Sequence, residues 1–244
     1  TQPVFDRYLG EIENGLKKRS ISAPLFIMTS NGGTVTPSIA RKFPVRALES
    51  GPAAGVLMSA LHGRNLQQKN LLSFDMGGTT AKGALVNNGE ALKRYEIEVA
   101  RIHDFKQGSG LLAKIPVIDM IEIGSGGGSI AALDSRGLLA VGPQSAGADP
   151  GPACYGHGGN AATVTDALVV LGRINASKPI SGDNNDILNI AAATAAIERD
   201  VGSPLGLNPE EAAQAIVTVA NNVISGSIRR ISIDRGHDPR DFAL

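Results

Sequence analysis

The feature that most constrains this chain is the stretch Leu71–Lys82, LLSFDMGGTTAK, where an apolar run meets a carboxylate, two glycines and two hydroxyls. The apolar run is predicted to form a buried strand. Asp75 at its end can hold a hydrated divalent cation, and Gly77 and Gly78 allow backbone N–H groups to come close to an anion. The same pattern is also typical of a tight hairpin turn into a second strand over 83–86. These residues alone leave both interpretations open.

The composition is ordinary for a globular protein and excludes several classes of partner. The chain has 244 residues, enough for one large domain or two small ones. Lys plus Arg and Asp plus Glu number 23 each, and aromatic residues make up 4%, so neither charge nor stacking indicates a nucleic-acid or membrane surface. No apolar run is long enough to span a bilayer. Because the single cysteine, Cys154, cannot form an internal disulfide, we expect a cytoplasmic protein.

Hydrophobic periodicity and turn residues predict the elements before the central stretch. They are, in order, an amphipathic helix (4–19), a buried strand (25–28), a polar turn (30–33), a short helix (37–43) and a longer helix (50–62). Ser50 is the expected N-cap of the last helix, and Pro52 lies in its first turn.

The same signals predict the rest of the chain. The expected elements are a strand (91–100) paired with 83–86, a polar loop (101–114), a strand (117–123), a hairpin (129–133 with 138–142), a short helix (167–171) capped by residues 163–166, a helix (186–201) and a long helix (209 to about 231). Asn208 followed by Pro209 is a strong start signal for the long helix. This order predicts an α/β fold with a mixed sheet flanked by helices.

Two loops are further candidates for function. Residues 124–129, GSGGGS, are a second phosphate or substrate candidate, with a plain structural turn as the alternative; the candidate residues are Gly126, Gly127, Gly128 and Ser129. Residues 142–159 form a long loop dense in glycine and proline, and such loops are usually functional. Its Asp149, Cys154 and His157 lack the second spaced pair of a typical metal site, and Cys154 has no evident base. We therefore expect a structural loop packed by its own small residues.

Seven motifs, in this order, resemble those of the hydantoinase A / 5-oxoprolinase family. They are SNGG (30–33), SGPAAGV (50–56), DMGGTTAK (75–82), IGSGGGSI (123–130), VGPQSAGADPGPACYG (141–156), TVTDA (163–167) and RGHDPRDF (235–242). The resemblance covers nearly the whole chain. It implies a lobe of the actin-like ATPase (ribonuclease H-like) fold and an ATP-dependent enzyme acting on cyclic amides such as hydantoins or 5-oxoproline. Related members are subunits of ATP-dependent acetone and acetophenone carboxylases.

The resemblance also assigns roles to residues. ATP would phosphorylate the ring amide oxygen, which makes the carbonyl carbon electrophilic before water opens the ring. Asp75 would hold Mg²⁺ through water, and the phosphates would be bound by Gly77, Gly78, Thr79 and Thr80. Lys82 stands where many members have Asp; it would neutralise phosphate charge or point into solvent. The catalytic residues are not identified by these motifs.

Finally, the resemblance implies that residues 1–244 are one hydantoinase A-type domain of a longer chain. The family's N-terminal lobe and the adenosine-binding turn expected after Leu244 are not in it, so this part alone is expected to be inactive and to bind nucleotide poorly. The expected partners are a cyclic amide substrate and a B-type subunit or further copies of the chain. The alternatives are a subunit of an ATP-dependent ketone carboxylase and a non-enzymatic actin-like regulatory module.

Overall fold

In the computed structural model, which describes residues 2–100, 108–179 and 187–244, the chain divides into two units that interleave in sequence. Unit 1 comprises residues 1–74, 84–120 and 238–244, and unit 2 comprises 75–83 and 121–237. The chain therefore enters unit 2 briefly at the central stretch, returns to unit 1, enters unit 2 again at residue 121, and returns to unit 1 at residue 238.

Unit 1 contains most of the short strands. Its elements are α1 (Gln2–Lys18), β1 (Ile27–Met28), β2 (Thr34–Val35), α2 (Pro37–Lys42), the 3₁₀ helix η1 (Pro44–Ala47), α3 (Ser50–Asn65), β5 (Glu90–Ala91), β6 (Lys93–Arg94), β7 (Ile97–Val99), β8 (Leu111–Ala113), β9 (Val117–Ile118) and η5 (Pro239–Asp241). Three strands have residues in both units: β3 (Leu71–Met76), β4 (Ala81–Asn87) and β10 (Met120–Ile123).

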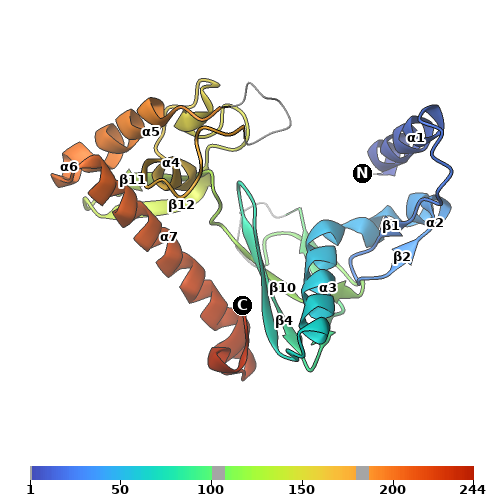
Figure 1. The fold of residues 1–244 in the computed structure, drawn as a ribbon. Helices are drawn as coiled ribbons and strands as arrows, with labels where there is room; N and C mark the ends of the chain where they lie inside the picture. The colour runs from blue at the N-terminus through green and yellow to red at the C-terminus, as the bar shows by residue number, and fades with distance from the viewer. Residues whose placement is uncertain (1, 101–107, 180–186) are drawn as a thin grey trace. The chain divides into compact units, whose positions relative to one another are not determined.

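The main sheet has the order β10-β4-β3, with β5 paired to β4. Figure 1 shows α3 beside β4, and small residues on the helix permit this close packing. The core around them, to which β9 and β10 also contribute, consists of Ala53, Val56, Ala60, Ala84, Val86, Ile118 and Met120. Near the C-terminus, Ala243 pairs in parallel with Leu71, so the apolar run 242–244 contributes to the edge beside β3.

Unit 2 packs helices against a hairpin (Figure 1). Its elements are β11 (Ser129–Leu133), β12 (Leu139–Ser145), η2 (Ala153–Tyr155), α4 (Val164–Val170), α5 (Ile190–Ile197), the π-helix η3 (Glu198–Gly202), α6 (Ser203–Leu205), α7 (Pro209–Ser232) and η4 (Ile233–Arg235). Its core is formed mainly by small and branched residues, including Ala131, Val141, Ala167, Ile197, Ala213 and Ile216. No described helix is both long and apolar enough to cross a membrane.

Most expected elements are confirmed, including the helices over 4–19, 37–43 and 50–62 and the hairpin of 129–133 with 138–142. The long helix also begins at Pro209 as expected, since the side chain of Asn208 accepts a hydrogen bond from the N–H of Glu211 in a capping box.

Several boundaries were wrong. The single strand expected over 91–100 is three short pieces, because each pairs with a different partner: β5 with β4, β6 with β9, and β7 with β8. The strand expected over 117–123 is likewise divided into β9 and β10. Part of the expected loop 101–114 is the strand β8, while residues 101–107 lie outside the described residues.

Three helix starts also differ from expectation. Ser50 is the first residue of α3 and not its N-cap, a position held by Glu49 with a left-handed φ of 55° and no capping side chain. The α4 helix begins at Val164, because Thr163 is its N-cap. The α5 helix begins at Ile190, and the expected start at residue 186 lies outside the described residues.

Candidate functional site

The turn Gly77–Thr80 joins β3 to β4 within unit 2 and follows Asp75 near the end of β3. The N–H of Gly77 donates to the carbonyl of Thr80 at 2.9 Å, which closes the turn. Residues 75–79 are exposed. In the part of the chain that the structure describes, the N–H groups of Gly78 and Thr79 meet no protein acceptor. The turn therefore presents backbone donors to solvent next to a carboxylate.

The Gly124–Ser129 loop packs directly on this turn. The N–H of Gly127 donates to the carbonyl of Gly77 at 3.0 Å, and that of Gly128 to the carbonyl of Gly78 at 2.6 Å. A Cβ on Gly126 would lie 2.6 Å from the Gly78 carbonyl oxygen, so only glycine permits this approach. The structure thus brings together the two glycine-rich segments that the sequence marked separately.

The two segments present their donors differently. In the Gly124–Ser129 loop, the N–H of Gly126 donates to the Ser129 hydroxyl at 2.8 Å, and the N–H of Ser129 donates to the Gly126 carbonyl at 3.1 Å. Together with the bonds of Gly127 and Gly128 to the turn, these contacts occupy all four amides. Phosphate binding by Gly126–Ser129 stays a prediction, but the described contacts are those of a support for the turn.

The loop is in turn held by α4, a contact that sequence reasoning missed. Both the N–H and the hydroxyl of Thr165 donate to the carbonyl of Gly127, each at 2.8 Å. The α4 helix begins with a capping box, in which Thr163 and Asp166 bond reciprocally. The spacing Thr-x-x-Asp is the signal for that box, but nothing in the sequence indicates which loop the next hydroxyl reaches.

Asp166 links this helix to the long glycine- and proline-rich loop. Its fully buried carboxylate accepts hydrogen bonds from the N–H of Cys154 at 2.7 Å, from the N–H of Ala153 at 3.3 Å and from the Thr163 hydroxyl at 2.7 Å. Burial raises the pKa of the Cys154 thiol, and the neighbouring Asp166 carboxylate raises it further. A thiol with a raised pKa is a poor nucleophile. The segment Gly151–Cys154 is therefore buried and held by α4, and a structural role for the rest of the loop stays a prediction.

Lys82 is not directed only to solvent. Its Nζ lies 3.6 Å from a carboxylate oxygen of Glu122 on β10, and only 17% of its side chain is exposed. The Glu122 carboxylate thus already offsets part of the Lys82 charge. Binding of the nucleotide by Lys82 stays a prediction.

The ligands available around Asp75 suit Mg²⁺ better than a metal ion whose ligands are all protein side chains. Among the described residues, no group of three or more His, Cys, Asp or Glu side chains gathers to hold a metal ion. Mg²⁺ keeps several waters and is usually held by one or two carboxylates together with substrate phosphates. The exposed carboxylate of Asp75 beside the Gly77–Thr80 turn meets that requirement.

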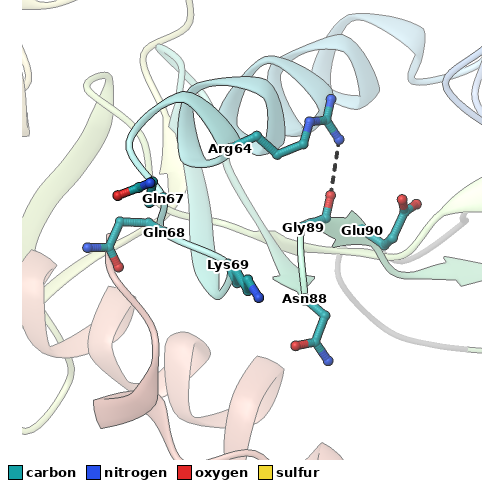
Figure 2. A pocket seen from close by; sticks show the side chains of 7 residues that line it. All are labelled: Arg64, Gln67, Gln68, Lys69, Asn88, Gly89 and Glu90. Carbon is teal, nitrogen blue, oxygen red and sulfur yellow. Dashed lines mark hydrogen bonds between the residues drawn. The ribbon is translucent and has the colours of Figure 1, made fainter.

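A separate polar pocket lies in unit 1, where the end of α3 meets the β4–β5 hairpin (Figure 2). It encloses about 410 Å³ and is lined by Arg64, Gln67, Gln68, Lys69, Asn88, Gly89 and Glu90. The Arg64 guanidinium donates to the carbonyl of Gly89 at 3.3 Å across the pocket. None of the residues that the sequence marked for function lines it.

Curated proteins similar to this chain include two enzyme subunits. The chain is 38% identical over 242 residues to the caprolactamase subunit alpha of Pseudomonas jessenii, covering 99% of this chain and 33% of that protein. It is 37% identical over 250 residues to the acetophenone carboxylase gamma subunit of Aromatoleum aromaticum, covering 99% of this chain and 32% of that protein. The chain thus spans about a third of the length of these relatives.

Solved structures confirm the fold. A nucleotide-free structure of acetone carboxylase matches with a TM-score of 0.80 at 28% identity, covering 96% of this chain and 31% of that one. The ATP-dependent caprolactamase of Pseudomonas jessenii matches with a TM-score of 0.77 at 37% identity, covering 100% of this chain and 34% of that one. The α/β fold of the actin-like ATPase type is therefore confirmed. The family described as hydantoinase/oxoprolinase matches residues 1–244, and the chain belongs to this family.

Proposed function

We propose that this chain is the part of an ATP-dependent enzyme that binds the nucleotide phosphates, and that the whole enzyme opens a cyclic amide by phosphorylating its oxygen. Similarity to a caprolactamase subunit and membership of the hydantoinase/oxoprolinase family support this substrate class. The observation that carries the proposal is the Gly77–Thr80 turn, whose exposed N–H groups lie beside Asp75.

The fold itself does not require glycine at either Gly77 or Gly78. Neither Gly77 nor Gly78 has a positive φ. A Cβ on Gly78 would meet no atom within 4 Å, and a Cβ on Gly77 would lie 3.5 Å from the nearest atom, an ordinary contact. A side chain would therefore fit the protein at both positions. A phosphate bound close to the backbone explains why neither residue has a side chain, since backbone N–H donors reach an anion best without a Cβ nearby.

The chemistry requires such a site because an unstrained amide resists hydrolysis. Transfer of the γ-phosphoryl group from ATP to the amide oxygen would release ADP and make the carbonyl carbon electrophilic. Water would add to that carbon, the C–N bond would break with the ring nitrogen leaving as a protonated amine, and hydrolysis of the remaining acyl phosphate would release the carboxylate and phosphate. The N–H groups of Gly78 and Thr79 would hold phosphate oxygens, and Asp75 would hold Mg²⁺ through water. The ion supplies neutralisation of phosphate charge.

The second candidate function is ATP-dependent carboxylation of a ketone. The acetophenone carboxylase subunit is nearly as similar to this chain as the caprolactamase subunit, and the acetone carboxylase structure shares its fold. Both reactions use ATP to activate a carbonyl or carboxyl oxygen, so the same phosphate site serves either. A non-enzymatic actin-like module is the third candidate, and it predicts no substrate-dependent ATP consumption.

We further propose that residues 1–244 belong to a longer chain that works with a B-type subunit or as an assembly of copies. The length of the relatives and their description as subunits support this. Another lobe would then complete the nucleotide site.

The test measures phosphate release by the full-length protein with its partner in the presence of caprolactam, hydantoin or 5-oxoproline. We expect ring opening with stoichiometric ATP use, and its loss in Asp75→Ala. Asp234→Ala, an exposed aspartate elsewhere in unit 2, is the matched control and should retain activity. ATP use that requires bicarbonate and a ketone would instead establish the carboxylase function.

A further inference from the structure

We infer that Thr165 is a positioning residue that orients the N–H of Thr79 toward the nucleotide phosphates, although it does not touch the nucleotide. The inference rests on the proposed function, in which the Gly77–Thr80 turn binds those phosphates. It is carried by a continuous chain of hydrogen bonds through two peptide groups.

The first link fixes the peptide group between Gly127 and Gly128. Thr165 donates twice to the carbonyl oxygen of Gly127, through its N–H and its hydroxyl, each at 2.8 Å. Only 8% of Thr165 is exposed, so its N–H and hydroxyl meet little competing water. The other end of the same peptide group is the N–H of Gly128. Because a peptide group is planar, fixing its carbonyl also fixes the direction of its N–H.

The second link fixes the peptide group between Gly78 and Thr79. The N–H of Gly128 donates to the carbonyl oxygen of Gly78 at 2.6 Å. That carbonyl shares its peptide group with the N–H of Thr79. The Gly78–Thr79 peptide bond is trans, because the cis peptide bonds among the described residues are those of Gly142-Pro143 and Asp149-Pro150. In a trans peptide the C=O and N–H point in opposite directions. The Thr79 N–H is thus directed away from Gly128.

The third link is the N–H of Thr79, the last group in this series of hydrogen bonds. Thr79 is exposed, and within the described residues its N–H meets no protein acceptor. Hydrogen bonds in series polarise one another, so the two bonds from Thr165 also strengthen the Thr79 N–H as a donor. The ligand at this last group is an anion that accepts from a backbone N–H, and a nucleotide phosphate is such a group.

The test removes the Thr165 hydroxyl and leaves its N–H in place. In the full-length protein, Thr165→Val should weaken ATP binding by about threefold to tenfold, because the Thr79 N–H is then held less firmly toward the phosphates. Thr165→Ser keeps the hydroxyl and should bind ATP like the unmodified protein. Thr218→Val is the matched control: its hydroxyl donates to the Gln214 carbonyl at 2.8 Å on α7, apart from the chain of bonds, and ATP binding should not change.

Adenosine distinguishes positioning from general damage because it has no phosphate. We expect Thr165→Val to bind adenosine as the unmodified protein does, and its unfolding temperature to fall by no more than a few degrees, the effect of losing one hydrogen bond. Equal weakening for ATP and adenosine, or unchanged ATP binding, would overturn the inference. If Thr165→Val does not fold, Thr165→Ser must bind ATP more tightly than Thr165→Ala, and equal binding by these two overturns it. An unmodified protein that binds no ATP would instead refute the proposed function.

Discussion

At the scale of single residues, the glycines of the site differ in why they are needed. Gly126 lets one backbone segment pack on another, since a Cβ there would lie 2.6 Å from both the Gly78 oxygen and the Thr79 carbonyl carbon. Gly78 has open space at the same position. Gly126 is therefore needed for backbone packing, whereas Gly78 leaves room for the phosphate that we propose.

This difference predicts opposite outcomes for two matched substitutions. Gly126→Ala should lower the free energy of unfolding by about 1–3 kcal/mol, because rigid backbone must shift to admit the methyl group. Gly78→Ala should leave thermal unfolding unchanged and weaken ATP binding by the full-length protein. Thermal unfolding followed by calorimetry with ATP checks both. A Gly126→Ala variant as stable as the unmodified protein would contradict this division of roles.

Cys154 gives a prediction on pH at the same scale. Burial and the Asp166 carboxylate raise the pKa of its thiol above the ordinary value of 9.0 in the folded state. Above pH 9 the unfolded chain therefore releases a proton that the folded chain keeps. The stability that the buried thiol contributes is fully present below pH 9 and is lost as the pH rises through the folded-state pKa.

Two measurements check this. Iodoacetamide should leave Cys154 unmodified in the folded protein at pH 8.5 and should alkylate it rapidly in urea, as read by mass spectrometry. The decline in unfolding midpoint above pH 9 should be smaller in Cys154→Ala than in the unmodified protein. Rapid alkylation of the folded protein would show that the thiol is accessible.

At the scale of elements, the short helix α4 has a larger role than its length indicates. Its capping box holds its first turn, Asp166 connects it to the Cys154 loop, and Thr165 connects it to the Gly124–Ser129 loop. By contrast, the capping box of α7 lies on the surface, and within the described part of the chain its hydrogen bonds stay in its own helix.

The α7 cap therefore gives a clean test of helix stability. Asn208→Ala removes an acceptor for the Glu211 N–H, 2.9 Å away, and should lower the free energy of unfolding by about 1 kcal/mol. Asn222→Ala, at an exposed interior position of α7, is the control and should be neutral or slightly stabilising. Urea unfolding measures the free energy of unfolding of both variants. Equal changes in the two would show that the Asn208 cap does not stabilise the helix.

At the scale of the whole molecule, the central stretch belongs to both units. Residues 71–74 lie in unit 1, whereas Asp75 and the Gly77–Thr80 turn lie in unit 2 with all of the contacts that support the turn. The described residues of this site, namely Asp75, the Gly77–Thr80 turn, the Gly124–Ser129 loop and Thr165, lie in unit 2.

We predict that residues 1–244 by themselves bind ATP only weakly, with a dissociation constant well above the micromolar range. The reason is that one phosphate-binding turn supplies few of the contacts that a nucleotide needs, and another lobe of the proposed longer chain would supply the rest. Calorimetry of this segment with ATP and Mg²⁺ is the measurement. Micromolar binding would show that this segment is a complete nucleotide site.

The sequence by itself determined the elements with strong local signals. The Asn208-Pro209 start of α7 and the Asp134–Gly137 turn of the β11–β12 hairpin follow from capping and turn chemistry, which act over a few residues. The ordered motifs likewise identified the family and the fold class. Candidate phosphate residues at Asp75 and the Gly77–Thr80 turn were visible because an aspartate followed by two glycines is a local pattern.

Only the tertiary structure decided how these pieces work together. The strand expected over 91–100 is divided because its pairing partners come from distant segments, which no local pattern encodes. The structure also placed the Gly124–Ser129 loop on the turn, paired Lys82 with Glu122, and directed Thr165 to Gly127. These contacts join residues far apart in the chain. Their geometry depends on packing of the whole unit, and local propensity carries no information about it.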